Sequence, residues 1–114
     1  MPYLRIQTNK EIDEASKASF LDHASKLVAE QLGKPESYVM VDFAPRRPMR
    51  FAGRDDACAY LELKSIGLPE TRTRSLSEAL CGAVESELGV PADRVYIEFA
   101  DAPRAMWGWN KGTF

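Results

Sequence analysis

The strongest constraint on this chain is an internal repeat. The segment LGKPESYVMVDFA, which begins at Leu32, closely matches LGVPADRVYIEFA, which begins at Leu88. Six of the thirteen aligned positions are identical, and Val41/Ile97 and Asp42/Glu98 are conservative replacements. Self-similarity at this separation predicts a fold built from two copies of one supersecondary unit.

Each copy is predicted to contain one amphipathic helix before the quoted segment. Gly33 and Gly89 are typical of left-handed residues that end a helix, and a proline two residues further on prevents its continuation. A capping box formed by Ser75 and Glu78 is expected to start the second helix. Apolar side chains recur at helical spacing in both copies, and the residues on these two faces are Phe20, Ala24, Leu27, Val28 and Gln31, then Leu76, Leu80, Ala83, Val84 and Leu88.

Alternating segments flank each predicted helix and indicate strands. YLRIQT from Tyr3 resembles YLELKS from Tyr60, and the repeated segments end in YVMVDF and RVYIEF. A strand–helix–strand unit makes its two strands parallel with a right-handed crossover. We therefore expect a two-layer α+β fold with pseudo-twofold symmetry: a four-stranded sheet, parallel within each repeat, short edge strands, and two helices on one face. One domain spans residues 1–114, with halves 2–44 and 59–100 and a tail 101–114.

The two faces of the predicted sheet differ in character. One face is apolar and is expected to meet the helices; it comprises Leu4, Ile6, Val39, Val41, Phe43, Leu61, Leu63, Val95, Ile97 and Phe99. The other is mixed and comprises Tyr3, Arg5, Gln7, Met40, Asp42, Tyr60, Glu62, Lys64, Tyr96 and Glu98. Parallel sheets are rarely bare on one side, and two helices cannot cover both faces. We therefore expect an oligomer whose subunits cover the mixed face.

Charge and composition narrow the classes of function. A net charge of −2 and a pI near 5.4 argue against a nucleic-acid or membrane partner, and no apolar run reaches the length of a membrane span. Cys58 and Cys81 form neither a disulfide framework nor a zinc pattern, so a cytoplasmic protein with reduced thiols is expected. No phosphate-binding glycine loop or metal-ligand cluster appears, and neither a metal nor a cofactor is expected. The arginines of the segment PRRPMRFAGRDDA suggest a solvated loop, or one that steers carboxylate substrates.

Several short segments carry a resemblance to a known family. MPYLRIQTN, GKPESYV, KSIG, DRVYI and WGWNKGTF resemble the macrophage migration inhibitory factor family of the tautomerase superfamily, over the whole of residues 1–114. The resemblance implies a homotrimer of βαβ repeats, with three sheets around a central channel. It also implies active sites between neighbouring subunits.

The same resemblance makes Pro2 the catalytic residue once Met1 has been removed. A secondary amine would then stand at the chain terminus, where an α-amino group ordinarily titrates near ~7.7–8.0. An apolar pocket and a neighbouring cation would lower its pKa, so that it could accept a proton from carbon beside a carbonyl. The alternative is that Pro2 reflects only easy removal of the initiator methionine.

The remaining site residues follow from the resemblance, and each has a structural alternative. Lys34 would bind a substrate carboxylate, or only favour the end of its helix. Ile66 would offer a backbone N–H, or only fill the core at a strand end. Tyr96 of a neighbouring subunit would offer a hydroxyl, or only line the channel. The pocket walls would be Tyr38, Trp107, Trp109 and Phe114, which could instead be packing residues.

Three departures from the best-known members bear on function. Glu98 stands where they carry an asparagine, which brings a negative charge near an anionic substrate and bears on substrate preference. Trp107 replaces a smaller residue and narrows the pocket mouth. Cys58 is followed three residues later by Leu61, so the Cys-x-x-Cys thiol chemistry of some members is rejected. Cys81 is expected to be a small buried hydrophobe.

The predicted activity is keto–enol tautomerisation of an aromatic α-keto acid such as phenylpyruvate, without a cofactor. One alternative is a cytokine-like signalling or interaction protein with a vestigial pocket and an unknown receptor. A second is an isomerase acting on a dopachrome-like compound. Animal relatives leave cells without a signal peptide, so secretion remains open.

Overall fold

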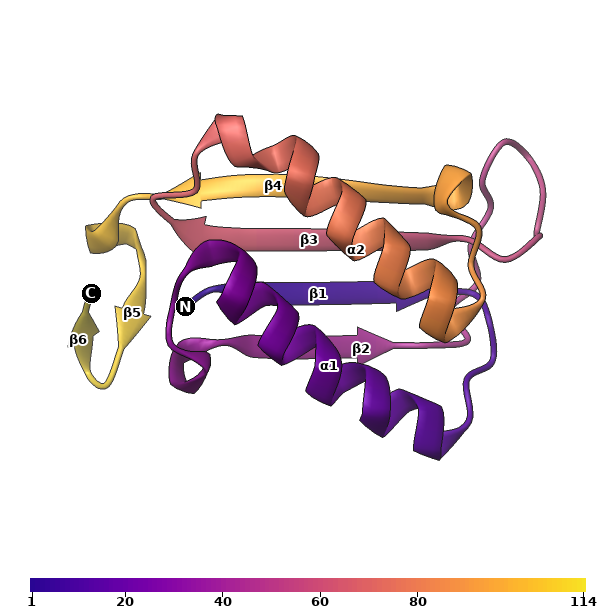
Figure 1. The fold of residues 1–114 in the computed structure, drawn as a ribbon, viewed down its shortest axis with the longest axis horizontal. Helices are drawn as coiled ribbons and strands as arrows, with labels where there is room; N and C mark the ends of the chain where they lie inside the picture. Colours follow the sequence, from indigo (N-terminus) through magenta and orange to yellow (C-terminus); the bar gives the residue numbers. More distant parts are fainter.

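The computed structural model describes residues 1–114 as a four-stranded sheet with two helices across one face (Figure 1). The strands lie in the order β2-β1-β3-β4. Their bounds are β1 Tyr3–Thr8, β2 Met40–Ala44, β3 Ala59–Ile66 and β4 Val95–Ala102, and the helices are α1 Glu14–Leu32 and α2 Thr73–Leu88. The two-layer α+β prediction is confirmed.

The pairing of the strands reproduces the sequence repeat. β1 and β2 are parallel, as are β3 and β4, so each half is the predicted βαβ unit. The central strands β1 and β3 are antiparallel, with Leu4 opposite Leu63 and Ile6 opposite Leu61. An antiparallel junction between two similar units gives the expected pseudo-twofold relation, and it places the start of β1 beside the end of β3.

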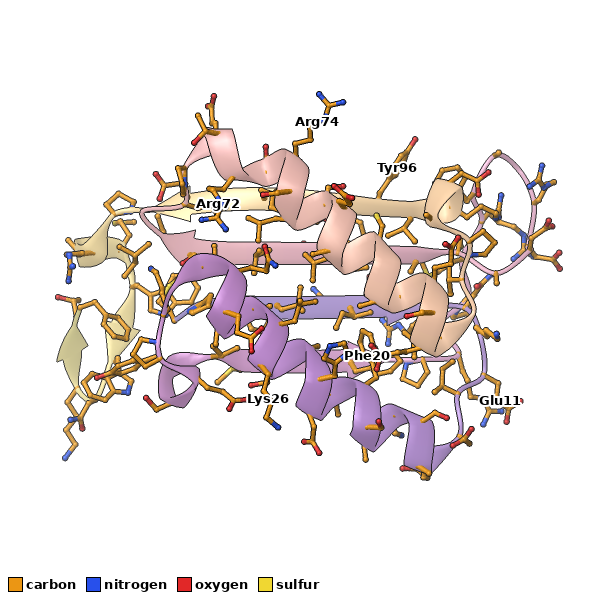
Figure 2. All side chains as sticks on the ribbon, viewed as in Figure 1. Glu11, Phe20, Lys26, Arg72, Arg74 and Tyr96 are labelled. Carbon is orange, nitrogen blue, oxygen red and sulfur yellow. The ribbon has the colours of Figure 1, made fainter.

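The core lies between the helices and the predicted apolar face of the sheet. Leu4, Ile6, Leu61 and Leu63 are fully buried. Phe20 of α1 lies over the sheet (Figure 2), with its ring centroid 5.6 Å from that of Phe43 in β2. The rest of the apolar face packs against this cluster or belongs to it, and its members are Val39, Val41, Val95, Ile97 and Phe99. The prediction of which face meets the helices is confirmed.

Both helices end as the glycines indicate. Gly33 follows α1 with φ 62° and Gly89 follows α2 with φ 71°, both left-handed. The Gly33 and Lys34 N–H groups donate to carbonyls of the last turn of α1, at 3.2 and 2.9 Å. This termination fixes the backbone from which Lys34 projects.

The predicted capping box at Ser75 is wrong. A 3₁₀ turn, Glu70–Arg72, runs directly into α2, and the Thr73 N–H donates to the Glu70 carbonyl. Because α2 already begins at Thr73, Ser75 lies within its first turn, and its hydroxyl donates to the Arg72 carbonyl at 3.1 Å. The Glu70 carbonyl of the preceding turn therefore accepts an N–H group at the start of α2, a role that the Ser75 side chain was expected to have.

The repeated segments contain a turn that periodicity did not predict. Glu36–Tyr38 and Ala92–Arg94 are 3₁₀ turns between the proline and the following strand. Tyr38 and Arg94, expected as strand residues, therefore precede β2 and β4. This single turn changes the direction in which Tyr38 projects, and it brings its ring to the end of the sheet.

The face of the sheet opposite the helices is uncovered. Met40 and Tyr96 are 65% and 66% exposed there, and the Tyr3 hydroxyl donates to Asp42 at 3.1 Å. At one end of the sheet, beside the N-terminus, the short strands β5 Gly108–Trp109 and β6 Gly112–Thr113 form a hairpin (Figure 1). Neither helix combines the length and hydropathy that crossing a membrane requires.

Candidate active site

The candidate site lies at the end of the sheet that carries the N-terminus. Pro2 directly precedes β1, Lys34 follows α1, and Ile66 ends β3. The antiparallel pairing of β1 with β3 sets Tyr3 opposite Lys64, which brings these segments to the same end. The Pro2 ring is fully buried, and its carbonyl accepts from the Met40 N–H at 2.9 Å. Pairing to the neighbouring strand thus fixes the backbone next to the Pro2 nitrogen.

An apolar pocket of about 270 Å³ opens beside Pro2. The ring centroid of Tyr38 is 5.7 Å from that of Trp109 and 5.7 Å from that of Phe114, and Trp109 and Phe114 stack at 5.5 Å. Trp107 lines the same pocket. The four aromatic residues predicted to form the walls are therefore together, and the cavity suits a flat ring.

A second pocket, which contains two cationic side chains, adjoins the first around Lys34. Its lining includes Lys34, Ile66 and Arg104, and it shares Met1, Tyr38 and Phe114 with the aromatic pocket. The Lys34 ammonium donates to the Ile66 carbonyl at 2.6 Å. Burial lowers the pKa of Lys34, the nearby positive charge of Arg104 lowers it further, and Asp101 opposes the shift.

The chain terminus lies at the junction of the two pockets. Met1 lines both of them and is buried. Burial lowers the pKa of its amino group below the ordinary value of 8.0, and the charge of Lys34 lowers it further. An amine at this place is therefore biased towards its unprotonated form, by the two causes that the resemblance led us to expect for Pro2.

Tyr96 and Glu98 lie elsewhere in the chain. Tyr96 is near the start of β4, opposite Tyr60 of β3 and at the far end of the sheet from Pro2, and Glu98 is in the middle of β4, opposite Glu62. Tyr96 lies at the sheet edge (Figure 2), with its ring centroid 4.8 Å from that of Phe51. One chain thus brings together seven of the nine predicted site residues and separates these two from them.

Glu98 belongs to a cluster around a tyrosine hydroxyl. The Tyr60 hydroxyl lies 3.1 Å from a Glu62 carboxylate oxygen and 3.2 Å from one of Glu98. Burial and these hydrogen bonds raise the pKa of Tyr60 to about 12. Tyr60 thus stays protonated and holds the Glu98 carboxylate in place on the uncovered face.

Two residues at the site were not predicted. Arg104 lines the pocket of Lys34, and Asp101 accepts from the N–H groups of Gly67 and Leu68 at 2.8 and 3.1 Å, which holds the turn after β3. The only sequence signal for Arg104 is a cation three residues before Trp107 in the tail. Periodicity cannot place it, because the tail lies outside the repeat.

The other sequence candidates lie away from the site. The arginine-rich loop 45–57 projects from the opposite end of the sheet (Figure 1), so within one chain it does not steer substrates to this pocket. Cys58 is buried, whereas Cys81, which was predicted to be buried, packs against the core but is only partly buried.

Comparisons with known proteins agree with this geometry. The family described as macrophage migration inhibitory factor (MIF) matches residues 1–114. A macrophage migration inhibitory factor homolog from Brugia malayi is 42% identical, with 100% of this chain and 99% of the relative covered. The mouse macrophage migration inhibitory factor is 37% identical, with the same coverage.

Solved structures of similar proteins give the same result. The crystal structure of a homologue from Prochlorococcus marinus superposes with a TM-score of 0.93 at 44% identity, covering 98% of both chains. The factor from Trichinella spiralis gives 0.91 at 33% identity, covering 98% of this chain and 99% of that one. The chain therefore belongs to the macrophage migration inhibitory factor family, within the tautomerase superfamily.

Proposed function

We propose that the protein is a cofactor-independent tautomerase that interconverts the keto and enol forms of an aromatic α-keto acid such as phenylpyruvate. The observation that carries the proposal is the position of the buried Pro2, which lines an aromatic pocket and follows Met1, the residue shared by that pocket and the cationic one. The first pocket suits the ring of such a substrate and the second suits its carboxylate.

Removal of Met1 would make the Pro2 nitrogen the chain's terminal amine. The burial and the Lys34 charge that lower the pKa of the Met1 amine act on the same small region. A lowered pKa would make the Pro2 amine more readily unprotonated near neutral pH than an ordinary α-amino group. The proline ring and the hydrogen bond of its carbonyl to Met40 would restrict the direction of the lone pair.

The reaction then needs one group that acts first as base and then as acid. The Pro2 nitrogen takes a proton from the carbon next to the keto group, and the C–H electron pair forms the enolate. Lys34 and the backbone N–H of Ile66 stabilise the negative charge as it develops. The protonated amine then gives the proton to the enolate oxygen, which completes the enol, and the reverse sequence yields the keto form.

The uncovered sheet face supports a homotrimer. Tyr96 and Glu98 line neither pocket of their own chain; Tyr96 is 66% exposed, and Glu98 lies beside the Tyr60 hydroxyl on the uncovered face. In a closed ring of three copies, each subunit presents one surface to the neighbour on one side and a different surface to the neighbour on the other. Tyr96 and Glu98 of one subunit would then complete the pocket of its neighbour.

The test is ketonisation of phenylpyruvate, followed as loss of the enol absorbance with protein whose intact mass shows Met1 removed. Pro2→Gly should keep the assembly, as judged by sedimentation, and lose most of the activity. Full activity in Pro2→Gly would refute the base assignment. A processed wild-type protein without activity would instead favour a signalling or interaction role with an inert pocket.

A further inference from the structure

Arg104 is an unpaired cation at the site. It lines the same pocket as Lys34, and its positive charge contributes to lowering the pKa of the Lys34 ammonium. Its guanidinium donates no hydrogen bond within the chain and belongs to none of the chain's five ion pairs. All five of its N–H donors are therefore available to a ligand.

Lys34 has fewer free hydrogen-bond donors for a ligand than its position in the pocket suggests. One of the three donors of its ammonium is committed to the Ile66 carbonyl. Asp101 is the carboxylate that acts on Lys34, but it accepts the N–H groups of Gly67 and Leu68 and forms no ion pair with either cation. The pocket therefore has two positive charges without a direct partner.

We propose that Arg104 and Lys34 form a two-cation clamp for the substrate carboxylate, in which the Arg104 guanidinium makes the bidentate contact. The planar fork of an arginine matches the two oxygens of a carboxylate, whereas an ammonium acts as a point charge. The aromatic pocket shares Tyr38 and Phe114 with this clamp. A ligand that carries both a ring and a carboxylate would place its ring in the aromatic pocket and its carboxylate at the clamp. This inference rests on the proposed function, and it assigns to Arg104 the selectivity of the site for substrates that carry a carboxylate.

The fluorescence of the protein offers a test that does not need activity. Both tryptophans of the chain, Trp107 and Trp109, line the aromatic pocket. Tryptophan emission therefore reports on ligands bound there. Phenylacetate and phenylacetamide have the same shape and differ in charge, so their Kd values separate recognition of the carboxylate from recognition of the ring.

Arg104→Gln should weaken phenylacetate binding about tenfold, the effect of one charged hydrogen-bonded contact, and leave phenylacetamide binding within about twofold. Arg104→Lys keeps the positive charge but lacks the planar guanidinium. Its Kd for phenylacetate should therefore be closer to that of Arg104→Gln than to that of wild type. The matched control is Arg74→Gln. Arg74 is an exposed residue of α2 whose side chain extends outward from the helix (Figure 2), and its replacement should leave both Kd values unchanged. With phenylpyruvate, Arg104→Gln should raise KM and leave kcat near wild type.

Three results would overturn the clamp. In the first, wild-type protein binds phenylacetate no more tightly than phenylacetamide. In the second, Arg104→Gln binds phenylacetate as tightly as wild type. In the third, Arg104→Gln loses affinity for phenylacetate and phenylacetamide equally. Full recovery in Arg104→Lys would refute the bidentate contact. A protein without tautomerase activity whose acid binding still depends on Arg104 would refute the proposed function and support the clamp.

Discussion

The Lys34 ammonium donates a 2.6 Å hydrogen bond to the carbonyl of Ile66, and this contact ties the loop after α1 to the end of β3. The two residues come from different repeats, so the contact joins the halves of the molecule at the candidate site. Met1, Arg104 and Phe114 line the pocket that contains both residues. The hydrogen bond restricts the flexible lysine side chain, and the positive charge that it holds there contributes to lowering the pKa of the Met1 amine.

Replacing Lys34 should change the pH dependence of activity. Lys34→Met removes the positive charge that helps to lower the pKa of the terminal amine, so that pKa rises. Because the unprotonated amine is the base, the acidic limb of kcat/KM against pH should move to higher pH. Lys26→Met, on the exposed side of α1 (Figure 2), is the control and should leave the limb in place. An unmoved limb in Lys34→Met would show that this charge does not tune the base.

Mixing two inactive variants tests whether sites are shared between subunits. Pro2→Gly lacks the base, and Tyr96→Ala lacks the hydroxyl that a neighbour is proposed to supply. In trimers refolded together, a Pro2 from one variant can meet a Tyr96 from the other, and random mixing at equal amounts restores up to about a quarter of the sites. Activity measured before and after co-refolding checks this. No recovery, with mixed trimers confirmed by native mass spectrometry, would place Tyr96 outside the neighbour's site.

Two glycine substitutions should have opposite effects on stability. A Cβ on Gly33 or on Gly82 would meet nothing within 4 Å, so neither change causes a clash. Gly33→Ala forces alanine to φ 62° and should cost about 1 kcal/mol. Gly82→Ala in the middle of α2 should stabilise by about 0.5–1 kcal/mol. Urea unfolding at one fixed protein concentration measures both, and the same sign for the two variants would contradict the assigned backbone conformations.

Arg94 should matter for stability through its hydrogen bonds. It is 6% exposed and donates to the carbonyls of Ala57, Asp56 and Phe51, at 3.0, 3.1 and 3.3 Å. Arg94→Met keeps much of the volume but leaves these carbonyls without their donor, at a cost of about 2–4 kcal/mol. Arg54→Met changes an exposed arginine in the loop whose carbonyls Arg94 contacts, and it should change stability by less than about 0.5 kcal/mol. Equal effects of the two variants on the urea midpoint would show that the hydrogen bonds of Arg94 do not stabilise the fold more than an exposed arginine does.

The sequence repeat predicts the fold well because it carries two periodicities at once. Alternation in segments such as YLELKS correctly places Leu61 and Leu63 in the core and Tyr60 and Glu62 on the open face. The helix ends at Gly33 and Gly89 follow from backbone sterics, which depend only on neighbouring residues. Features of this kind are local, and local patterns are sufficient to predict them.

Features that depend on contacts between distant segments could not be predicted in this way. Ser75 has the pattern of a cap, but a turn three residues earlier already begins the helix. Arg104 and Lys34 are close in space although most of the chain separates them, and no spacing rule connects a tail residue with a loop after the first helix. The positions of Tyr96 and Glu98 follow from the repeat, yet their partner pocket depends on how copies of the chain meet.

The central claim is that the Pro2 nitrogen is a free amine that is unprotonated near neutral pH. NMR titration of processed protein labelled with ¹⁵N-proline measures the pKa of that nitrogen directly, and the pH profile of kcat/KM gives the kinetic value for comparison. The account predicts a pKa below the ordinary range of ~7.7–8.0 that coincides with the acidic limb of the activity. A nitrogen that titrates within or above that range, or an active protein that retains Met1, would contradict it.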